Sequence, residues 1–135
     1  MRYFDTNVLI NYLVEQDTEK QLQAKRLYAE SAANQTFFIT LLSLQELTYA
    51  LAKIKVEQAE IEDAYEKWHS PELQDYSPDI FARAFWLSRY IGFKHTNDCL
   101  HTAMGEAYGC TELITYNRKD FVRIQPLTSL KIIIL

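Results

Sequence analysis

The sequence predicts an α/β domain in which helices surround a parallel sheet. Short segments rich in aromatic and β-branched residues alternate with longer segments whose apolar residues recur at helical spacing. This alternation is typical of parallel sheets, because each crossover between parallel strands needs a long connection, usually a helix. With 135 residues the chain has the size of one domain, so we expect a single domain over residues 1–135.

The N-terminal half is expected to contain two strands and four helices. Arg2–Phe4 is a brief strand, and Asp5 marks its end. A helix should follow, because these apolar residues recur at helical spacing: Val8, Leu9, Tyr12 and Leu13. The other expected elements are a helix over Thr18–Ala33, a buried strand over Phe37–Thr40, a helix that begins at Ser43, and a charged helix over Val56–Trp68.

The C-terminal half is expected to contain two helices and two strands. A strongly apolar helix contains Ile80 and Ile91, and Gly92 is placed to end it. We assign its Phe81 and Phe85 to the core, where aromatic residues at apolar helical positions usually lie. The later elements are a helix from Thr96 that stops at Gly109, a strand over Glu112–Thr115, a short turn before Phe121, and a final strand in the tail Lys131–Leu135, which could also dock elsewhere.

The composition narrows the classes of function. A net charge of −4 argues against a broad basic surface for duplex nucleic acid. Much of the acidic charge lies between positions 57 and 79, however, so binding to a short single strand remains open. The chain shows neither a signal peptide nor a membrane span, and we expect a cytosolic protein. Cys99 and Cys110 lack C-x-x-C spacing and should be buried and reduced.

Side chains with oxygen ligands gather where the expected strands end and helices begin. In open α/β sheets these positions face one crevice beyond the carboxyl ends of the strands. Mg²⁺ and Mn²⁺ prefer oxygen ligands, and crowded carboxylates repel one another until a cation joins them. Such a cation can activate water for attack on a phosphodiester bond. The residues are Asp5 after the first strand, Glu46 and Asp98 in the first turns of their helices, and Thr115, Asn117 and Asp120 near the end of a later strand.

Each carboxylate also has a purely structural explanation. The spacing of Ser43 and Glu46 fits a capping box, and Asp5 could cap the helix that follows it. Asp98 suits the first turn of a helix capped by one of the two residues before it, because the helix dipole favours an acid there. Capping and metal binding are compatible, so the joint placement of the three acids carries the prediction.

Other side chains are weaker candidates. His101, one turn after the third acid, is more simply explained as a partly buried, hydrogen-bonded imidazole, since hard divalent ions favour oxygen. Tyr116 is the aromatic residue that we would test for base stacking, and Arg118 and Lys119 are the nearest candidates for phosphate contacts. Two further histidines carry no pattern that indicates a role, His69 and His95.

Four segments resemble the motifs of PIN domains, particularly the toxins of the VapC type, in the same order and at similar separations. They are Phe4-Asp5-Thr6-Asn7-Val8-Leu9-Ile10, Ser43-x-x-Glu46-Leu47, Asp98-Cys99-Leu100-His101-x-Ala103 and the stretch Leu113–Phe121. The resemblance covers nearly the whole chain, and the ordered set is more specific than any one segment. It implies a three-layer α/β/α sandwich around a parallel sheet, a Mg²⁺ or Mn²⁺ site, and endoribonuclease activity on single-stranded RNA.

The resemblance also implies roles within the site. Asp5, Glu46 and Asp98 match the three principal acids, as metal ligands. Asn117 stands where the family often has a fourth acid; its amide oxygen could bind metal or orient a water, but a second tightly held metal is not expected. The additional candidates are Asp120, which could assist or only cap a turn, and Thr115 and Asn7, which match positions that orient carboxylates.

Partners follow from the same resemblance. Toxins of the VapC type usually form homodimers and are inhibited by a small antitoxin whose tail enters the active-site groove, so we expect both partners. Two alternatives remain open: a PIN nuclease of RNA processing without an antitoxin, and a degenerate PIN domain that binds protein or RNA without cutting. Asn117 and the acidic net charge favour the degenerate domain. The presence of all three principal carboxylates favours the enzyme.

Overall fold

A four-stranded parallel sheet lies at the centre of the computed structural model, which describes the whole chain from Met1 to Leu135. The strands, in the spatial order β2-β1-β3-β4, are β1 (Arg2–Phe4), β2 (Phe37–Phe38), β3 (Glu112–Thr115) and β4 (Lys131–Ile134). The expected parallel sheet and the strand in the tail are therefore confirmed. Strand β2 is shorter than expected, because Thr40 forms only an isolated bridge with Gln74.

Seven α-helices and two 3₁₀ turns connect the strands. They are α1 (Thr6–Leu13), α2 (Thr18–Ala33), α3 (Leu41–Lys53), α4 (Gln58–Trp68), α5 (Pro78–Ile91), α6 (Thr96–Ala107) and α7 (Arg118–Ile124), with the turns η1 (Phe93–His95) and η2 (Gln125–Leu127). Helix α7 occupies the segment that we expected to be a short turn. None of the helices combines the length and the apolar character that a membrane crossing requires.

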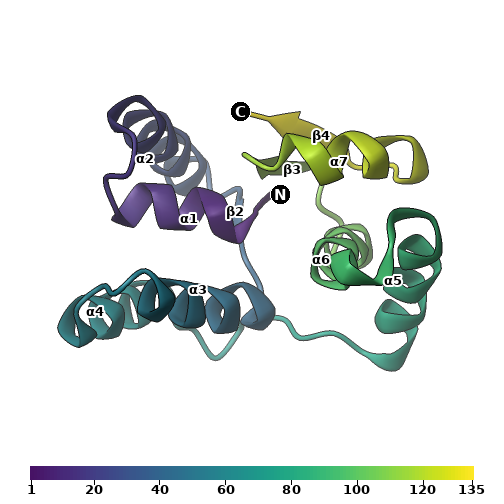
Figure 1. The fold of residues 1–135 in the computed structure, drawn as a ribbon, viewed down its shortest axis with the longest axis horizontal. Helices are drawn as coiled ribbons and strands as arrows, with labels where there is room; N and C mark the ends of the chain where they lie inside the picture. The colour runs from purple at the N-terminus through teal and green to yellow at the C-terminus, as the bar shows by residue number, and fades with distance from the viewer.

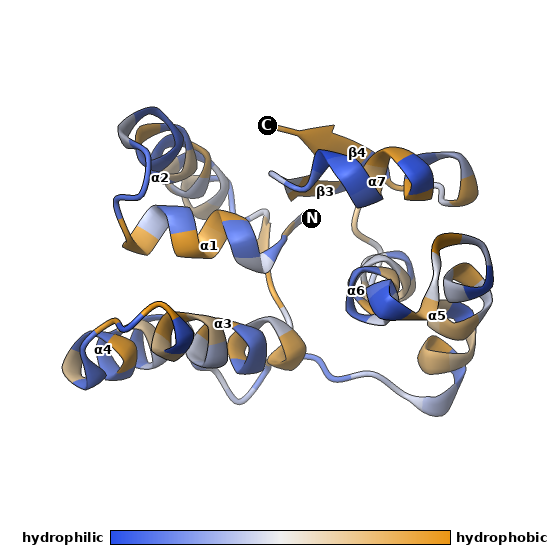
Figure 2. Cartoon of the chain, in the orientation of Figure 1, coloured by the Kyte–Doolittle hydropathy of each residue, from blue (hydrophilic) through white to orange (hydrophobic).

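Helices cover both faces of the sheet. Neighbouring residues of a strand point to opposite faces, so Tyr3 joins a core with residues of α5, α6 and α7, while Phe4 joins a second core with residues of α1 to α4. Figure 1 shows α5 and α6 on one side and α1 to α4 on the other. Figure 2 colours β4 as hydrophobic, as is usual for strands covered on both faces. This is the expected three-layer α/β/α sandwich.

Helix α5 departs from the expected burial. Its ends are well defined, since Ser77 caps the start and Gly92, at φ 113°, follows the last residue. However, Phe81 and Phe85 are 41% and 48% exposed, so their assignment to the core is wrong. Ala84, Leu87 and Ile91 fill the inner face of the helix instead. The outer face is left with unusually many aromatic residues.

Both cysteines are buried and unpaired, as expected: Cys99 and Cys110.

Helix α6 lies close to β1, because Gly105 has no side chain to separate them. A Cβ atom at Gly105 would lie 3.4 Å from Cδ2 of Tyr3 and 3.0 Å from Cδ1 of Leu130. The close approach brings the first turns of α6 to the carboxyl end of β1.

Candidate functional site

Asp5 lies at the carboxyl end of β1 and caps α1. Its Oδ1 accepts a hydrogen bond from the backbone N–H of Thr6 (2.8 Å), which confirms the expected capping role. Its Oδ2 accepts from the hydroxyl of Thr115 (2.6 Å) and from the amide of Asn7 (3.0 Å). Burial raises the pKa of Asp5 despite these bonds, since it removes water from the charged form.

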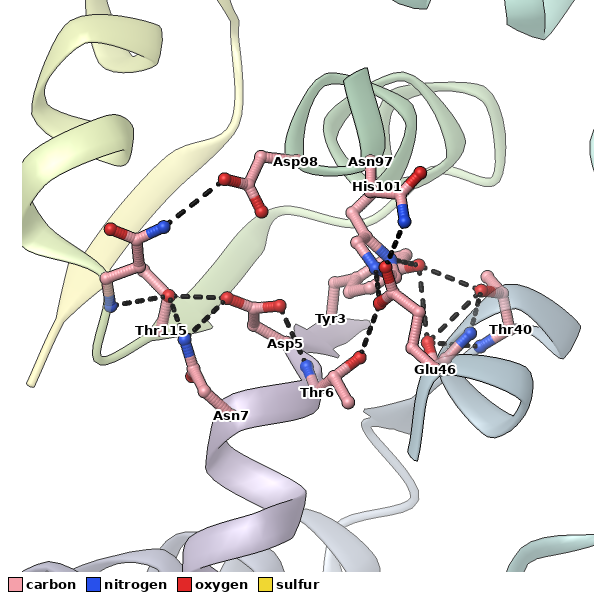
Figure 3. A network of polar contacts seen from close by, with 12 residues as sticks. Tyr3, Asp5, Thr6, Asn7, Thr40, Glu46, Asn97, Asp98, His101 and Thr115 are labelled. Atoms are coloured by element: carbon pink, nitrogen blue, oxygen red, sulfur yellow. Dashed lines mark hydrogen bonds and ion pairs between the residues drawn. The ribbon is translucent and has the colours of Figure 1, made fainter. Parts of the chain in front are cut away.

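Asn7 and Thr115 join β1 to β3 around this carboxylate. The Asn7 amide also donates to the Thr115 hydroxyl (3.2 Å), and its carbonyl oxygen accepts from the backbone N–H of Tyr116 (3.1 Å). Figure 3 shows Asp5 between Thr115 and Thr6, with Asp98 reaching into the same space from α6. Asn7 and Thr115 therefore have the geometry of supports that fix the position of the Asp5 carboxylate.

Glu46 reaches the same region from the second turn of α3. The expected capping box was misplaced. Thr40 caps this helix by accepting from the backbone N–H of Ser43, and the Ser43 hydroxyl accepts from the backbone N–H of Thr40 in return. The helix therefore begins at Leu41, and Glu46 has no role in the cap. Capping of α3 therefore does not explain this carboxylate.

The hydrogen bonds of Glu46 come from two other elements, α1 and α6. Oε1 accepts from the Thr6 hydroxyl (2.8 Å) and from Nε2 of His101, and Oε2 accepts from the Asn97 amide (2.7 Å). Burial alone would raise the pKa of Glu46, but the bond and charge of His101 and the two other bonds lower it overall. Glu46 is therefore held as a carboxylate.

His101 is fully buried behind Glu46. Its Nδ1 lies 2.5 Å from the hydroxyl of Tyr3, which in turn lies 2.9 Å from the Thr40 hydroxyl. Burial opposes the imidazolium, but Tyr3 and Glu46 on its two nitrogens more than offset this and raise the pKa of His101 well above its usual value. The expectation of a hydrogen-bonded imidazole is confirmed, although the ring is completely rather than partly buried.

Asp98 occupies the first turn of α6. Neither Thr96 nor Asn97 caps this helix, contrary to expectation: the N-cap is His95, without a side-chain capping bond, and the Asn97 amide serves Glu46 instead. Burial raises the pKa of Asp98 to about 7, with further contributions from the negative charges of Asp5, Asp120 and Glu46, and His101 opposes the shift. The fold thus crowds carboxylates around Asp98, and the charge of His101 does not outweigh their repulsion.

Asn117 caps α7 and bridges two acids. Its Oδ1 accepts from the backbone N–H of Asp120 (3.3 Å), so the amide oxygen faces the helix. Its Nδ2 donates to Oδ2 of Asp98 (3.2 Å) and of Asp120 (2.9 Å). Asn117 therefore holds the two carboxylates together rather than adding a further charge. Asp120 itself is buried, and its Oδ1 has no hydrogen-bond partner.

These residues fit a divalent cation. The raised pKa of Asp98 and the orphaned Oδ1 of Asp120 both call for a positive charge, and the ligands are carboxylate oxygens. Asp5 and Glu46 belong to no group of three ligands whose atoms all lie within 4.8 Å of one another. A cation shared by Asp5, Glu46 and Asp98 would therefore be bound partly through water, as Mg²⁺ commonly is.

Sequence reasoning missed three residues that contact the predicted ones. Thr6 and Asn97 donate to Glu46, and His95 places its Nδ1 3.2 Å from Oδ2 of Asp120. Thr6 and Asn97 each adjoin a predicted acid, and that adjacency was the available signal. His95 lies one helical turn before Asp98, a spacing that indicates a shared face only if the intervening turn is helical.

A hollow of about 700 Å³ adjoins Glu46 and is bordered by exposed aromatic rings. Tyr49, Tyr76 and Phe81 line it together with Asn97. Tyr116 is less available than expected, since its hydroxyl donates to the Lys20 carbonyl and to Gln23, and the Lys20 ammonium covers its ring. Exposed aromatic rings therefore lie on the Glu46 side of the site.

The chain belongs to the PIN domain family, whose pattern matches residues 2–125. Two solved structures have the same fold. One is VapBC2 from Rickettsia felis bound to a DNA fragment from their promoter: 23% identity, TM-score 0.72, covering 100% of this chain and 99% of that one. The other is FitAcB from Neisseria gonorrhoeae: 13% identity, TM-score 0.68, covering 98% and 96%. No curated protein gives a significant match.

Proposed function

We propose that this chain is a Mg²⁺- or Mn²⁺-dependent endoribonuclease that cleaves single-stranded regions of RNA. The observation that carries the proposal is the convergence of Asp5, Glu46 and Asp98 at the carboxyl end of the sheet, with the pKa of Asp98 raised to about 7. A divalent ion bound there neutralises charge on the scissile phosphate and activates water for attack. Thr115 and Asn7 orient Asp5, and Thr6, Asn97 and His101 hold Glu46 as a carboxylate.

The surroundings of the site suit a single strand. Bases stack on exposed aromatic rings regardless of sequence, and Tyr49, Tyr76 and Phe81 offer such rings beside Glu46. Two exposed cations follow Asn117 at the start of α7 and could contact phosphates, Arg118 and Lys119. The net charge of −4 argues against binding to a long duplex and leaves binding to a short strand open.

Cleavage of a structured RNA with labelled ends tests the proposal. We expect Mg²⁺ or Mn²⁺ to support cuts in loops, EDTA to abolish them, and Asp5→Asn or Asp98→Asn to slow them at least about 100-fold, since several kcal/mol of transition-state stabilisation depend on the cation. Asp63→Asn, an exposed acid on α4, is the matched control. Equal cleavage by wild type and both site variants would refute the assigned site.

We further propose that the chain is a toxin of the VapC type that acts in the cytosol as a homodimer and is inhibited by an antitoxin. The motifs shared with those toxins and the fold similarity to VapBC2 support this. Expression of the chain alone should arrest growth, and co-expression of the product of a short upstream reading frame should restore it. A PIN nuclease of RNA processing would lack such a neighbour.

A degenerate PIN domain that only binds RNA or protein is the second candidate. Asn117 favours it, because an amide stands in place of an acid and adds no negative charge that would help to hold a cation. Calorimetry separates the two functions. Failure of the folded chain to bind Mg²⁺ or Mn²⁺ at millimolar concentration would support the binding module over the enzyme.

A further inference from the structure

A second group of potential ligands adjoins the site through Asp98. His95 of η1, Asp98 of α6 and Asp120 of α7 each offer one ligand atom, and these three atoms all lie within 4.8 Å of one another. The separation suits ligands around one ion, since opposite ligands at bond lengths of about 2.1–2.3 Å lie roughly 4–5 Å apart. His95 and Asp98 are partly exposed, so an ion could reach the group from solvent.

Asp120 supplies an independent observation that points to an ion. The residue is only 7% exposed, and its Oδ1 has no hydrogen-bond partner. A buried carboxylate oxygen without a donor is costly, and such groups in native proteins usually have an ion or water as partner. Lys and Arg side chains provide no partner, since the one charged contact of Asp120 is His95.

An ion pair between His95 and Asp120 does not account for this arrangement. Nδ1 of His95 faces Oδ2 of Asp120 at 3.2 Å, and that oxygen already accepts from the Asn117 amide at 2.9 Å. The pair therefore adds a second partner to the satisfied oxygen and leaves Oδ1 without one. A cation that bridges the imidazole and the carboxylates would satisfy the group as a whole.

The donor set discriminates between cations. Mg²⁺ demands oxygen ligands and keeps much of its water, whereas divalent transition metals accept an imidazole nitrogen beside carboxylate oxygens. His95 is positioned for this by the backbone, because its N–H donates to the carbonyl of Gly92 (3.0 Å), the residue that ends α5.

We propose that His95, Asp98 and Asp120 form a second cation site, which takes a divalent transition-metal ion such as Mn²⁺ through one imidazole nitrogen and two carboxylate oxygens. This inference rests on the proposed function, since Asp98 is shared with the site at Asp5 and Glu46. It makes His95 a residue that selects the metal. The chain then binds one more Mn²⁺ than Mg²⁺.

Mn²⁺ itself is the probe. Pulsed electron paramagnetic resonance of the full chain loaded with Mn²⁺ detects ¹⁴N in direct coordination, and counting bound ions gives the stoichiometry. We expect ¹⁴N coupling in wild type, its loss in His95→Gln, and at least about tenfold weaker Mn²⁺ binding at the second site with Mg²⁺ binding unchanged. His69→Gln is the matched control, because His69 is exposed on α4's C-terminal end and stacks on Tyr65.

The second site would be overturned by Mn²⁺ bound without nitrogen coupling, by coupling that persists in His95→Gln, or by no bound Mn²⁺. Coupling that disappears instead in His101→Gln would assign the ligand elsewhere and overturn it as well. Wild type labelled with ¹⁵N-histidine must show ¹⁵N in place of ¹⁴N coupling, which tests histidine coordination without any substitution. RNA cleavage in Mg²⁺ is measured separately, so the second site can fail while the proposed nuclease stands, and the reverse.

Discussion

The Asp98 carboxyl group links ionisation to stability. A carboxyl group whose pKa is higher in the folded than in the unfolded chain stabilises the fold only while it is protonated. With a pKa of about 7 in the fold, against about 4 when unfolded, Asp98 loses this contribution as the pH rises from about 4 to 7.

We therefore expect Asp98→Asn to melt at a higher temperature than wild type at pH 8 in EDTA. The difference should shrink at pH 5, where the wild-type group is protonated, and also in saturating Mg²⁺ or Mn²⁺, which favours the wild-type carboxylate. Thermal melts in matched buffers measure all three conditions. Parallel pH profiles for the two proteins would contradict the assigned burial and repulsion.

Tyr3 is the residue that anchors His101 behind Glu46. Removing its hydroxyl in Tyr3→Phe leaves Nδ1 of His101 without its partner and should cost about 1–3 kcal/mol of unfolding free energy. The pKa of His101 should fall, because the Tyr3 oxygen helps to raise it. Urea unfolding and the NMR titration of His101 measure the two effects. Tyr12→Phe is the control, since the Tyr12 ring packs against Tyr28 and Trp68 but no side-chain hydrogen bond involves its hydroxyl.

At the scale of elements, Gly92 sets where α5 ends and where η1 begins. Its φ of 113° lies in a region that side chains rarely adopt, so Gly92→Ala should cost about 1–3 kcal/mol although the new Cβ meets only ordinary contacts. Because His95 is tied to the Gly92 carbonyl, Mn²⁺ binding should weaken too. Gly109→Ala, at φ 74° with free space around it, should lower stability without affecting Mn²⁺. Equal Mn²⁺ affinity in both variants would show that the backbone conformation at Gly92 does not affect the second cation site.

The elements also show what could be predicted from the sequence. Strands β1 and β3 and the carboxylate positions followed from local pattern, because these apolar segments end at polar residues, and β4 followed from its run of β-branched residues. Helix α7 did not, since it is only seven residues long and depends on Asn117 as its cap. The cap of α3 was misplaced because Thr40 and Ser43 are both of residue types that commonly cap helices. In the fold Thr40 is the cap, and the Tyr3 hydroxyl contacts the hydroxyls of both residues, a tertiary contact that local pattern does not reveal.

At the scale of the whole molecule, the outer face of α5 and η1 is the candidate for a homodimer interface. Phe85 packs on Phe93 and Trp86 on Tyr90, with ring centroids 5.1 and 4.8 Å apart, yet all four rings remain exposed. The spacing of apolar residues in the sequence could not reveal that these rings are exposed, since a buried and an exposed aromatic residue look alike in a sequence.

Replacing two of these rings, in Tyr90→Ser with Phe93→Ser, should weaken dimerisation at least about tenfold if the rings are interface anchors. Analytical ultracentrifugation over a concentration series measures the change. Leu22→Ser, which removes an exposed apolar residue of α2, should leave it unaffected. A wild-type chain that stays monomeric at high concentration would exclude the homodimer.

Three consecutive residues at the end of β1 connect the two cores with the site: Tyr3 lies in one core, Phe4 in the other, and Asp5 in the site. Folding and metal binding are therefore thermodynamically linked, because a cation that binds only the folded chain stabilises it by RT ln(1 + [L]/Kd). Variants weakened in either core should regain stability as Mg²⁺ or Mn²⁺ is added. In a cell, the free concentration of these ions would then set how much of a marginally stable variant stays folded and escapes proteolysis.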